Sequence, residues 1–442
     1  MLTRKIQQLK NIYWFARGNN STRAVSAYLR KQLLIATAYL WRRLLFNTTF
    51  IAITGSVGKT TTKEFLSDIL AQHYPVMKTP GNANLRRFKG LEETILKTRP
   101  WHRYAVVELG IEKPGDMASA ARFLKPDMAV VLDIKHCHTN VFKSLESIAE
   151  EKSQLVKALD KGDCAVLNKD NNHVAAMAAV TKARIISFGT HEQAEFRMLN
   201  ATSRWPERLT LAVSHNNNHY KVETRLIGTH WSNTIMASLA AAHECGISIP
   251  DAIKAIRTIE PFWARMQPIT LPNKATIIRD DWNGSIDTFE VALQFLQDAE
   301  ATRKIVVFSD FSDSRKKLRS RANYLGKIAA THADHAVFVG DYADRSTQSA
   351  IEAGMDPESV HDFFNLSDAI DFLKKELREG DLVLIKGQAN HHLSRIYLGL
   401  LGDVTCSLPS CSKQILCDRC PDLGFEWTHD MAPFRAAPGS SV

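Results

Sequence analysis

The sequence predicts an α/β protein with two sheet domains in tandem, preceded by a helical segment. Short apolar, β-rich runs alternate with helix-forming stretches twice along the 442 residues, as in parallel sheets covered by helices on both faces. The first alternation also opens with a strand, a glycine-containing turn and a helix. We therefore expect four parts: a basic helical segment (1–48), a P-loop domain (49–262), a doubly wound domain (263–402) and a cysteine-rich tail (403–442) that is partly disordered.

The helical segment carries the excess positive charge of the chain. Residues 1–48 contain nine Lys or Arg and no Asp or Glu, whereas the rest is balanced, so the net charge of +9 gives no sign of nucleic-acid binding by the body of the protein. Residues 1–17 and 21–46 are predicted to form two helices that mix apolar, aromatic and basic side chains. This mixture is typical of a peripheral helix on an anionic membrane surface or on a protein partner. A helical pair packed on the next domain, with its basic face in water, fits the pattern equally well.

The sequence contains no evident signal peptide or membrane span. The apolar run from Leu33 to Trp41 lies too far into the chain for a signal peptide and is too short to cross a bilayer. Seven cysteines without an export signal indicate a reducing cytosol. We therefore expect a cytoplasmic protein, with any membrane contact made peripherally at the inner face through residues 1–48.

Residues 50–64 have the pattern of a phosphate-binding loop. Phe50 to Ile53 predict a short strand, Thr54 to Gly58 a turn, and a helix-forming stretch begins at Lys59. Backbone N–H groups and the helix dipole converge at such a turn and bind anions. The spacing departs from a full Walker A motif, because Ile53 stands at the position of its first Gly. Lys59 would contact the outer phosphates of a nucleoside triphosphate, and the Thr60 hydroxyl would ligate Mg²⁺. The predicted nucleotide-binding residues here are Gly55, Ser56, Gly58, Lys59, Thr60 and Thr61.

Further strands and helices follow in alternation. In the first domain, strands are predicted at 104–109, 128–133, 164–167, 185–188 and 209–220, and helices at 144–159, 232–245 and 250–258. A linker at 261–264 leads to the second domain. There, strands are predicted at 275–279, 304–310, 335–340 and 381–386, and helices at 286–299, 318–331, 345–354 and 367–378. The second alternation predicts a doubly wound, Rossmann-like sheet.

Several motifs occur in order along both domains. The loop is followed by Thr79-Pro-Gly-Asn-Ala-Asn84, Val107-Glu-Leu-Gly110, Asp133-Ile-Lys-His-Cys-His138 and Ala149-Glu-Glu-Lys-Ser153. Later come Gly228-Thr-His230, Ser232-Asn233, Ala264-Arg265-Met266, Ile278-Arg-Asp-Asp-Trp-Asn283 and Leu384-Ile-Lys-Gly387. Over about residues 50–400 this series resembles the Mur ligases, the ATP-dependent amide ligases that build the peptidoglycan stem peptide. The branch that adds D-alanyl-D-alanine to a UDP-muramoyl tripeptide is the most similar.

The resemblance implies a metal-assisted site in the first domain. Glu108 would bind Mg²⁺ together with Thr60, and His138 would bind a second Mg²⁺ with Lys152. Lys152 would be carbamylated, because an ammonium group cannot ligate a cation. Each residue has a plainer alternative: Glu108 as a capping or surface carboxylate, His136 in place of His138, and Lys152 as a solvated lysine of a charged helix.

The resemblance also implies nucleotide contacts near the linker. His230 and Asn233 would lie on the adenine side, although their spacing is one residue shorter than in the family. Arg265 would reach towards the γ-phosphate from the linker, and Ala264 stands where the family has Gly. The implied ligand is ATP.

The second domain would add two nucleotide contacts, Asp280 and Asn283. Two neighbouring residues depart from the family pattern: Arg279 replaces an Asp and Trp282 replaces a Tyr. Asn283 is followed by Gly, which is a turn signal in its own right. The predicted catalytic residues are Lys59, His138, Lys152 and Arg265.

These residues imply ATP-dependent joining of a carboxylate to an amine. Near pH 7 the carboxylate needs activation, and phosphorylation by ATP gives an acyl phosphate that the amine attacks, with release of ADP and phosphate. The acceptor is expected to be a cell-wall-like precursor and the amine an amino acid or dipeptide. Only 48 residues precede the P-loop strand, and they cannot form the sheet domain that binds the UDP-sugar in this family. The alternatives are a Mur-type ligase of a secondary-metabolite or poly-amino-acid pathway, and a non-catalytic nucleotide-binding scaffold.

Four cysteines cluster in the tail: Cys406, Cys411, Cys417 and Cys420. In a reducing cytosol such a cluster more often binds metal than forms disulfides, and Cys417 with Cys420 forms a knuckle-like pair. A structural Zn²⁺ ion is expected here. An iron–sulfur cluster uses the same ligands, and free thiols are the alternative.

Overall fold

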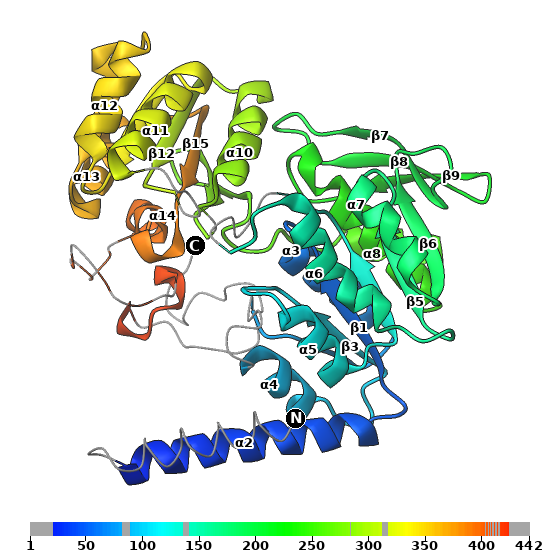
Figure 1. Cartoon of the computed structure of the whole chain (residues 1–442). Coiled ribbons are helices and arrows are strands. Elements are labelled where there is room, and N and C mark those ends of the chain that lie inside the picture. Colours follow the sequence, from blue (N-terminus) through cyan, green and yellow to red (C-terminus); the bar gives the residue numbers. More distant parts are fainter. Residues whose placement is uncertain are drawn as a thin grey trace.

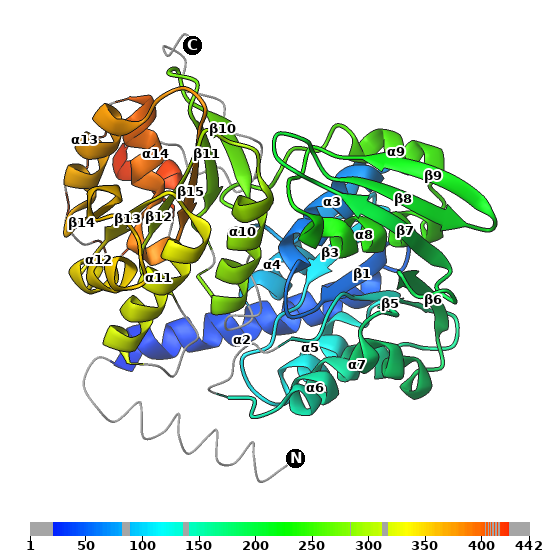
Figure 2. The same cartoon turned by 90° about the horizontal axis from the view of Figure 1, so that it is seen from above.

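The protein consists of two α/β domains that lie side by side, with helix α2 (Ser21–Leu44) along the base of the first (Figure 1). The computed structural model describes residues 21–81, 89–135, 141–282, 284–311 and 317–402, and in the tail residues 404, 406, 408, 411, 413 and 416–423. Seen from above, helix α10 (Ile286–Asp298) of the second domain faces the first domain (Figure 2). The predicted α/β class with two sheets is confirmed.

The first domain is built on a nine-stranded sheet in the order β2-β3-β1-β4-β5-β6-β7-β8-β9. The strands from β1 to β7 are parallel, and β8 is antiparallel to both of its neighbours. The central strands are buried along their whole length because helices cover both faces. Their bounds are β1 (Thr49–Thr54), β2 (Val76–Lys78), β3 (Tyr104–Glu108), β4 (Met128–Val131), β5 (Cys164–Asn168), β6 (Arg184–Gly189), β7 (Phe196–Thr202), β8 (Thr210–His215) and β9 (Asn218–Glu223).

Alternate residues of β1 enter two different apolar cores. Ile51 and Ile53 pack against α3 (Lys59–Ala71), α8 (Ser232–Glu244) and α9 (Ile249–Ile256). Phe50 and Ala52 point to the other face. That face is covered by α4 (Lys89–Lys97), α5 (Asp116–Leu124), α6 (Leu145–Lys157) and α7 (Asn172–Ala175).

The single strand predicted at 209–220 is wrong, because this stretch is a hairpin of β8 and β9. Asn216 and Asn217 have φ values of 48° and 62° and form its turn. Asparagine tolerates this left-handed conformation better than most residues, which is why an Asn pair can reverse the chain here. The preceding strand β7 was not predicted, since only one of its seven residues is buried and its apolar pattern is weak.

The second domain is built on a six-stranded sheet in the order β10-β11-β15-β12-β13-β14. All neighbours are parallel except β10 and β11, so the ends of β11 and β15 meet at one edge, where Asp280 pairs in register with Lys386. The unpredicted β14 has only four residues. The strand bounds are β10 (Gln267–Thr270), β11 (Thr276–Asp280), β12 (Arg303–Phe308), β13 (His335–Val339), β14 (Val360–Phe363) and β15 (Asp381–Lys386).

Helices cover both faces of this second sheet as well. On one face lie α10, α11 (Leu318–His332) and α12 (Ala343–Glu352), and on the other α13 (Leu366–Glu376) and α14 (Ser394–Leu401). Short 3₁₀ helices complete the described chain: η2 (Ala176–Val180), η3 (Thr229–Trp231), η4 (Pro357–Ser359), η5 (Ala389–His391), η6 (Cys417–Arg419) and η7 (Pro421–Leu423).

Helix α2 corresponds to the second of the two helices predicted in the basic segment; the first lies outside the described residues. Its carboxyl end is docked on the first domain. Trp41 Nε1 donates to the carbonyl of Thr98 at 2.9 Å, and Arg42 donates to the carbonyls of Leu124 and Lys125 at 2.6 Å each. Among the described helices, none has the length and apolar character needed to cross a membrane.

Glu92 is a buried carboxylate of α4, the helix on which α2 packs. Neither carboxylate oxygen has a hydrogen-bond partner in the described part of the chain, and burial raises the pKa of Glu92 from 4.5 to about 7, with Lys31 opposing the shift. The folded state therefore binds this proton more tightly than the unfolded state, and the resulting stability is lost as the pH rises from about 4.5 through about 7.

We expect Glu92→Gln to increase the free energy of unfolding at pH 8 by roughly 2–3 kcal/mol and to change it little at pH 5. Urea unfolding at both pH values measures the difference. Glu93→Gln is the matched control, because the neighbouring Glu93 is only half-buried and pairs with Lys97 at 2.7 Å. An equal effect of Glu92→Gln at both pH values would show that Glu92 does not titrate as expected.

Candidate active site

The predicted phosphate-binding loop joins β1 to α3. Gly55 and Gly58 have φ values of 155° and 82°, which are strained for any other residue. A Cβ on Gly55 would also lie 2.9 Å from the Cβ of Leu132, so the loop needs glycine for space. Lys59 Nζ donates to the carbonyls of Gly55 (2.9 Å) and Ser56 (3.2 Å), which folds its side chain back over the loop. The turn and the start of α3 together have the geometry that suits an anion.

Beside the loop, Thr60 and Glu108 form a second feature of the site. Thr60 Oγ1 donates to Glu108 Oε1 at 3.1 Å, and Glu108 ends the strand next to β1. The other carboxylate oxygen, Oε2, is buried and has no hydrogen-bond partner within the described residues. Leaving a buried carboxylate oxygen without a partner is costly, and a hydroxyl with a carboxylate is a ligand pair that suits Mg²⁺. Thr60 and Glu108 therefore fit the predicted Mg²⁺ site.

Lys63 stabilises this site from inside α3 and was not predicted from the sequence. It is completely buried, and its Nζ donates to the carbonyls of Thr79 (2.8 Å) and Gly81 and pairs with Glu64 at 2.7 Å. Thr79 Oγ1 in turn accepts the backbone N–H of Glu108 at 3.1 Å. Lys63 thus ties the segment after β2 to the strand that carries Glu108. Its only signal in the sequence is its position one helical turn after the loop lysine.

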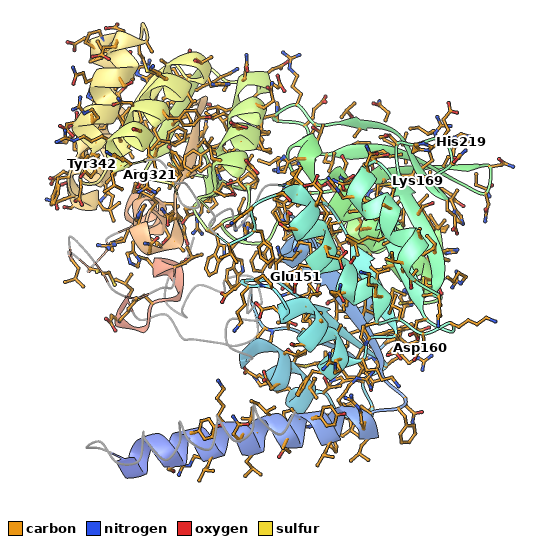
Figure 3. All side chains as sticks on the ribbon, in the orientation of Figure 1. Glu151, Asp160, Lys169, His219, Arg321 and Tyr342 are labelled. Carbon is orange, nitrogen blue, oxygen red and sulfur yellow. The ribbon has the colours of Figure 1, made fainter. Side chains whose placement is uncertain are left out.

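Lys152 lies on α6 with its amine at the phosphate loop. It is buried, and its Nζ lies 3.1 Å from the carbonyl oxygen of Gly55 and 3.4 Å from Thr54 Oγ1. The next-door Glu151, labelled in Figure 3, accepts two backbone N–H groups at the start of α5 at 2.8 and 2.9 Å and so fixes α6. Because Lys152 is buried, the alternative that it is a solvated lysine of a charged helix is wrong. His138, the residue predicted to act with Lys152, lies outside the described residues.

His230 and Asn233 lie in η3 and at the start of α8, which packs beside α3. Gly228 has a φ of 89°, and a Cβ there would lie 2.5 Å from the ring of His230, so glycine allows the ring to fold back over the turn. Burial lowers the pKa of His230 to about 4, although Asp280 opposes the shift. The ring is therefore neutral at pH 7, which suits contact with a flat base better than contact with a phosphate.

The linker places Arg265 between the two domains. Burial lowers the pKa of Arg265, and the charges of Asp280 in the second domain and Glu108 in the first oppose this shift. The residues on either side, Ala264 and Met266, have φ values of 50° and 48°. Ala264 thus adopts the left-handed conformation that glycine takes most easily, which accounts for a Gly at this position of the family pattern.

Asp280 is held by Lys386, a buried lysine that was not among the predicted site residues. Lys386 at the end of β15 has no exposed surface, and its Nζ pairs with Asp280 Oδ2. Asp280 Oδ1 accepts the backbone N–H of Met266 at 3.3 Å. One carboxylate therefore connects β11, β15 and the linker next to Arg265. Asn283, the other predicted contact of this domain, lies outside the described residues.

Comparison with known proteins identifies the family. The model of the Mur ligase middle domain matches residues 53–242, and the model of the Mur ligase, glutamate ligase domain matches residues 264–389. The chain belongs to the Mur ligase family. This Mur ligase is 28% identical over 412 residues to the UDP-N-acetylmuramoyl-tripeptide–D-alanyl-D-alanine ligase of Mycobacterium tuberculosis (strain CDC 1551 / Oshkosh), covering 88% of this chain and 79% of the relative.

Solved structures are similar over both domains. MurF from Acinetobacter baumannii matches with a TM-score of 0.75 and 25% identity, over 83% of this chain and 80% of that one. The MurF ligase from Thermotoga maritima, solved in complex with ADP, shares the fold with a TM-score of 0.70 and 21% identity, over 84% and 83% of the two chains. The predicted family, fold class and enzyme class are confirmed: this Mur ligase is an ATP-dependent amide ligase.

The four tail cysteines of this Mur ligase do not form the predicted zinc or iron–sulfur site. Cys406, Cys411, Cys417 and Cys420 are free thiols, and the described residues contain no group of three or more His, Cys, Asp or Glu side chains that could hold a metal ion. Cys417 instead packs into the second domain, where its Sγ lies 3.6 Å from His392 Nδ1. Burial raises the pKa of the Cys417 thiol, so it is protonated at neutral pH. The described tail therefore agrees with the alternative interpretation, in which these four cysteines are free thiols.

Proposed function

We propose that this enzyme joins a carboxylate of a peptidoglycan precursor to the amine of an amino acid or dipeptide, using ATP and an acyl phosphate intermediate. The observation that carries this proposal is that Arg265 of the linker lies within the electrostatic reach of Glu108 from the first domain and of Asp280 from the second, and both carboxylates oppose the lowering of its pKa by burial. Phosphoryl transfer depends on positioned charges rather than on covalent protein chemistry. The names of the relatives, UDP-N-acetylmuramoyl-tripeptide–D-alanyl-D-alanine ligase, support a peptidoglycan-type acceptor.

Two bond exchanges make up the proposed reaction. A carboxylate oxygen of the acceptor attacks the γ-phosphorus of ATP, the bond to the β,γ-bridging oxygen breaks, and ADP leaves. The amine nitrogen then attacks the acyl carbon, phosphate leaves with the electrons of the C–O bond, and the nitrogen loses a proton. Backbone N–H groups from Gly55 to Thr60 would bind the phosphates, while Lys59 and Arg265 would balance the charge that develops on them. Mg²⁺ would be held by Thr60 and Glu108 and supplies further charge neutralisation when bound.

We further propose that Lys152 carries a carbamate and, together with His138, forms a second Mg²⁺ site. The ammonium would first lose a proton, and the amine nitrogen would then bond to the carbon of CO₂ with loss of a second proton, which replaces the cation by a carboxylate-like group beside the phosphate loop. The support is its burial and its position 3.1 Å from the carbonyl oxygen of Gly55.

We expect Lys152→Ala to lower kcat by a factor of roughly 100 or more, because the variant lacks the charged carbamate beside the phosphates. Short carboxylic acids such as acetate should restore part of the lost activity, because their carboxylate can take the place of the carbamate. Initial rates of ADP release with and without acetate measure both effects. Lys157→Ala is the control, because Lys157 lies on the same helix and pairs with Glu150 at 2.8 Å near the surface. A variant that keeps full activity, or that no carboxylic acid restores, would argue against the carbamate.

The amine substrate is proposed to bind at the carboxyl edge of the second sheet. A cavity of about 800 Å³ opens there beside the ends of β12 and β13, at the same edge as the buried ion pair of β11 and β15. Arg321 and Tyr342 line it and lie near one another in Figure 3. Arg321 Nη2 pairs with Asp310 at 2.7 Å. A guanidinium in a cavity lined by both apolar and polar side chains suits the free carboxylate of an amino acid or dipeptide.

An ADP-release screen over acceptors and amines tests the proposed function. The acceptors are a UDP-muramoyl tripeptide, the same peptide without UDP, and glutamate oligomers; the amines are D-alanyl-D-alanine and single amino acids. We expect ADP release only when a muropeptide and an amine are both present, with a product whose mass is the sum of the two minus water. If glutamate oligomers were the only acceptors that gave turnover with an amine, the enzyme would belong to another amide-forming pathway. Absence of ADP release with every pair would support a nucleotide-binding scaffold.

We also propose that α2 rests on an anionic membrane surface at the inner face. The helix exposes five leucines: Leu34 (46%) and the four most exposed, Leu29 (59%), Leu33 (68%), Leu40 (64%) and Leu44 (61%). At about 100° per residue these four share one face of the helix, whereas the buried Ala38 lies on the opposite face, against the first domain. The apolar stripe therefore points away from the protein. Two copies of the basic segment would repel each other because it contains no acidic residue, whereas anionic headgroups attract it.

Sedimentation with lipid vesicles tests this surface. We expect the enzyme to bind vesicles of phosphatidylglycerol and phosphatidylcholine, not phosphatidylcholine alone, and the double variant Leu33→Glu, Leu40→Glu to lose binding at least tenfold. Leu318→Glu is the control, since Leu318 is an exposed leucine (44%) of another helix. Equal vesicle binding by the double variant and the control variant would refute the role of α2. The proposal would also fail if sedimentation velocity showed that the enzyme is a dimer and that the double variant, but not the control, is a monomer.

A further inference from the structure

The strand end that carries Asp280 is anchored from its other side by a buried arginine. Arg279 is 1% exposed, and it forms a two-pronged ion pair with Asp281, with Nε to Oδ1 at 3.1 Å and Nη2 to Oδ2 at 3.2 Å. Successive side chains of a strand point to opposite faces, so Arg279 and Asp281 lie on one side while Asp280 points to the other, towards Lys386. The two ion pairs therefore hold the same strand end from opposite sides.

The remaining nitrogen of this arginine is bound by the tail. Arg279 Nη1 donates to Asp418 Oδ2 at 3.0 Å, and the hydroxyl of Tyr397 donates to the same oxygen at 3.1 Å. The guanidinium carbon lies 3.8 Å from the centre of the Tyr397 ring. The neighbouring Cys417 N–H donates to Ser394 Oγ at 2.9 Å, which fastens this part of the tail to α14. Burial alone would lower the pKa of Arg279, but Asp281 and Asp418 outweigh it and hold that pKa above its ordinary value.

The pairing links two departures from the family pattern. Arg279 stands where the resemblance implies an acidic residue, and Asp418 lies outside the residues 264–389 that match the family's second domain. A buried arginine needs anionic partners, and Asp281 satisfies only one edge of its guanidinium. The tail supplies the second partner, so an arginine at this position depends on the tail.

We propose that residues 416–423 form a clasp on the second domain, in which Asp418 acts through Arg279 as a positioning residue for the nucleotide site. Asp418 would act without contacting the nucleotide itself. It fixes the end of β11, and that strand end sets the place of Asp280, which accepts the N–H of Met266 beside Arg265. The inference rests on the proposed role of Asp280 and Arg265 in binding ATP.

Steady-state kinetics of Asp418→Asn test the clasp. The substitution keeps the size of the side chain and removes its charge, so we expect the KM for ATP to rise about tenfold while the KM for the amine changes less than twofold. Asp422→Asn is the matched control, because Asp422 lies in the same tail but is exposed and pairs only with Lys413 among the described residues. It should leave both constants unchanged.

A double-mutant cycle separates positioning from general stability. Once Arg279→Met has removed the cation, adding Asp418→Asn should raise the KM for ATP less than twofold further. Calorimetric binding of ADP to the same variants reports the nucleotide site without turnover, so a failure of the ligase assignment is distinguishable from a failure of the clasp. If Asp418→Asn lowers the melting temperature but leaves ADP affinity and the KM for ATP within twofold of the parent, the clasp is only structural and the proposal is wrong. Independent, multiplicative effects of the two substitutions would also overturn it.

Discussion

Replacing Lys59 by methionine is expected to lower kcat/KM for ATP by a factor of roughly 100 to 1000, the usual cost of losing one preorganised charge at a transferring group. In the structure the ammonium donates to the carbonyls of Gly55 and Ser56 and so lies directly over the loop. Methionine keeps the length and apolar stem of the side chain and removes only the charge. Coupled measurement of ADP release over a range of ATP concentrations gives the effect.

Lys254→Met is the control for this substitution, since Lys254 is an exposed lysine of helix α9. It should leave kcat/KM unchanged. Melting curves should show that Lys59→Met remains folded, because the hydrogen bonds of the loop lysine are made to backbone carbonyls that other donors or water can satisfy. If Lys59→Met turns over ATP at the parental rate, the loop does not bind the transferred phosphate and the assignment of the site fails.

Local sequence patterns predicted much of the fold. They failed where contacts between residues distant in the sequence determine the structure. The strand, turn and helix around Lys59 were predictable because glycine spacing and apolar periodicity are both local. The hairpin at Asn216 and Asn217 was missed, since the stretch around it is β-rich on both sides and only the left-handed turn divides it. The tail cysteines were assigned a metal because of their clustering in sequence, whereas Cys417 packs against His392 in the second domain.

The residues of the candidate site also fall into those that local sequence patterns predicted and those that depend on distant contacts. Thr60 and Glu108 lie together as expected, because a motif and the end of a neighbouring parallel strand place them. Lys63 had no such signal, and the motif that contains Lys386 did not reveal its partner: each is a lysine whose partners are brought by loops or strands distant in the sequence. Burial of a lysine is rare enough that sequence patterns favour a solvated one.

The ion pair of Lys386 and Asp280 gives the second large expected effect. Lys386→Met would leave the Asp280 carboxylate buried without its cation, and breaking a buried pair in this way costs about 3–5 kcal/mol of stability. The carboxylate would also lose the orientation in which it accepts the N–H of Met266, so ligase activity should fall with stability. Urea unfolding measures the first effect and ADP release the second. Lys375→Met, at an exposed position of α13, is the control for the loss of one lysine.

The double variant Lys386→Met, Asp280→Leu separates the two roles of the pair. Replacing both members of a buried ion pair by apolar residues is often neutral for stability, so the double variant should regain most of the 3–5 kcal/mol. It should not regain activity, because no carboxylate is left at position 280 to accept the N–H of Met266 and so hold the linker that carries Arg265. Recovery of both properties would mean that the pair serves the fold alone. A loss below about 1 kcal/mol in Lys386→Met would mean that water or another cation takes the place of the lysine, and the pair would then not hold the second domain's half of the site.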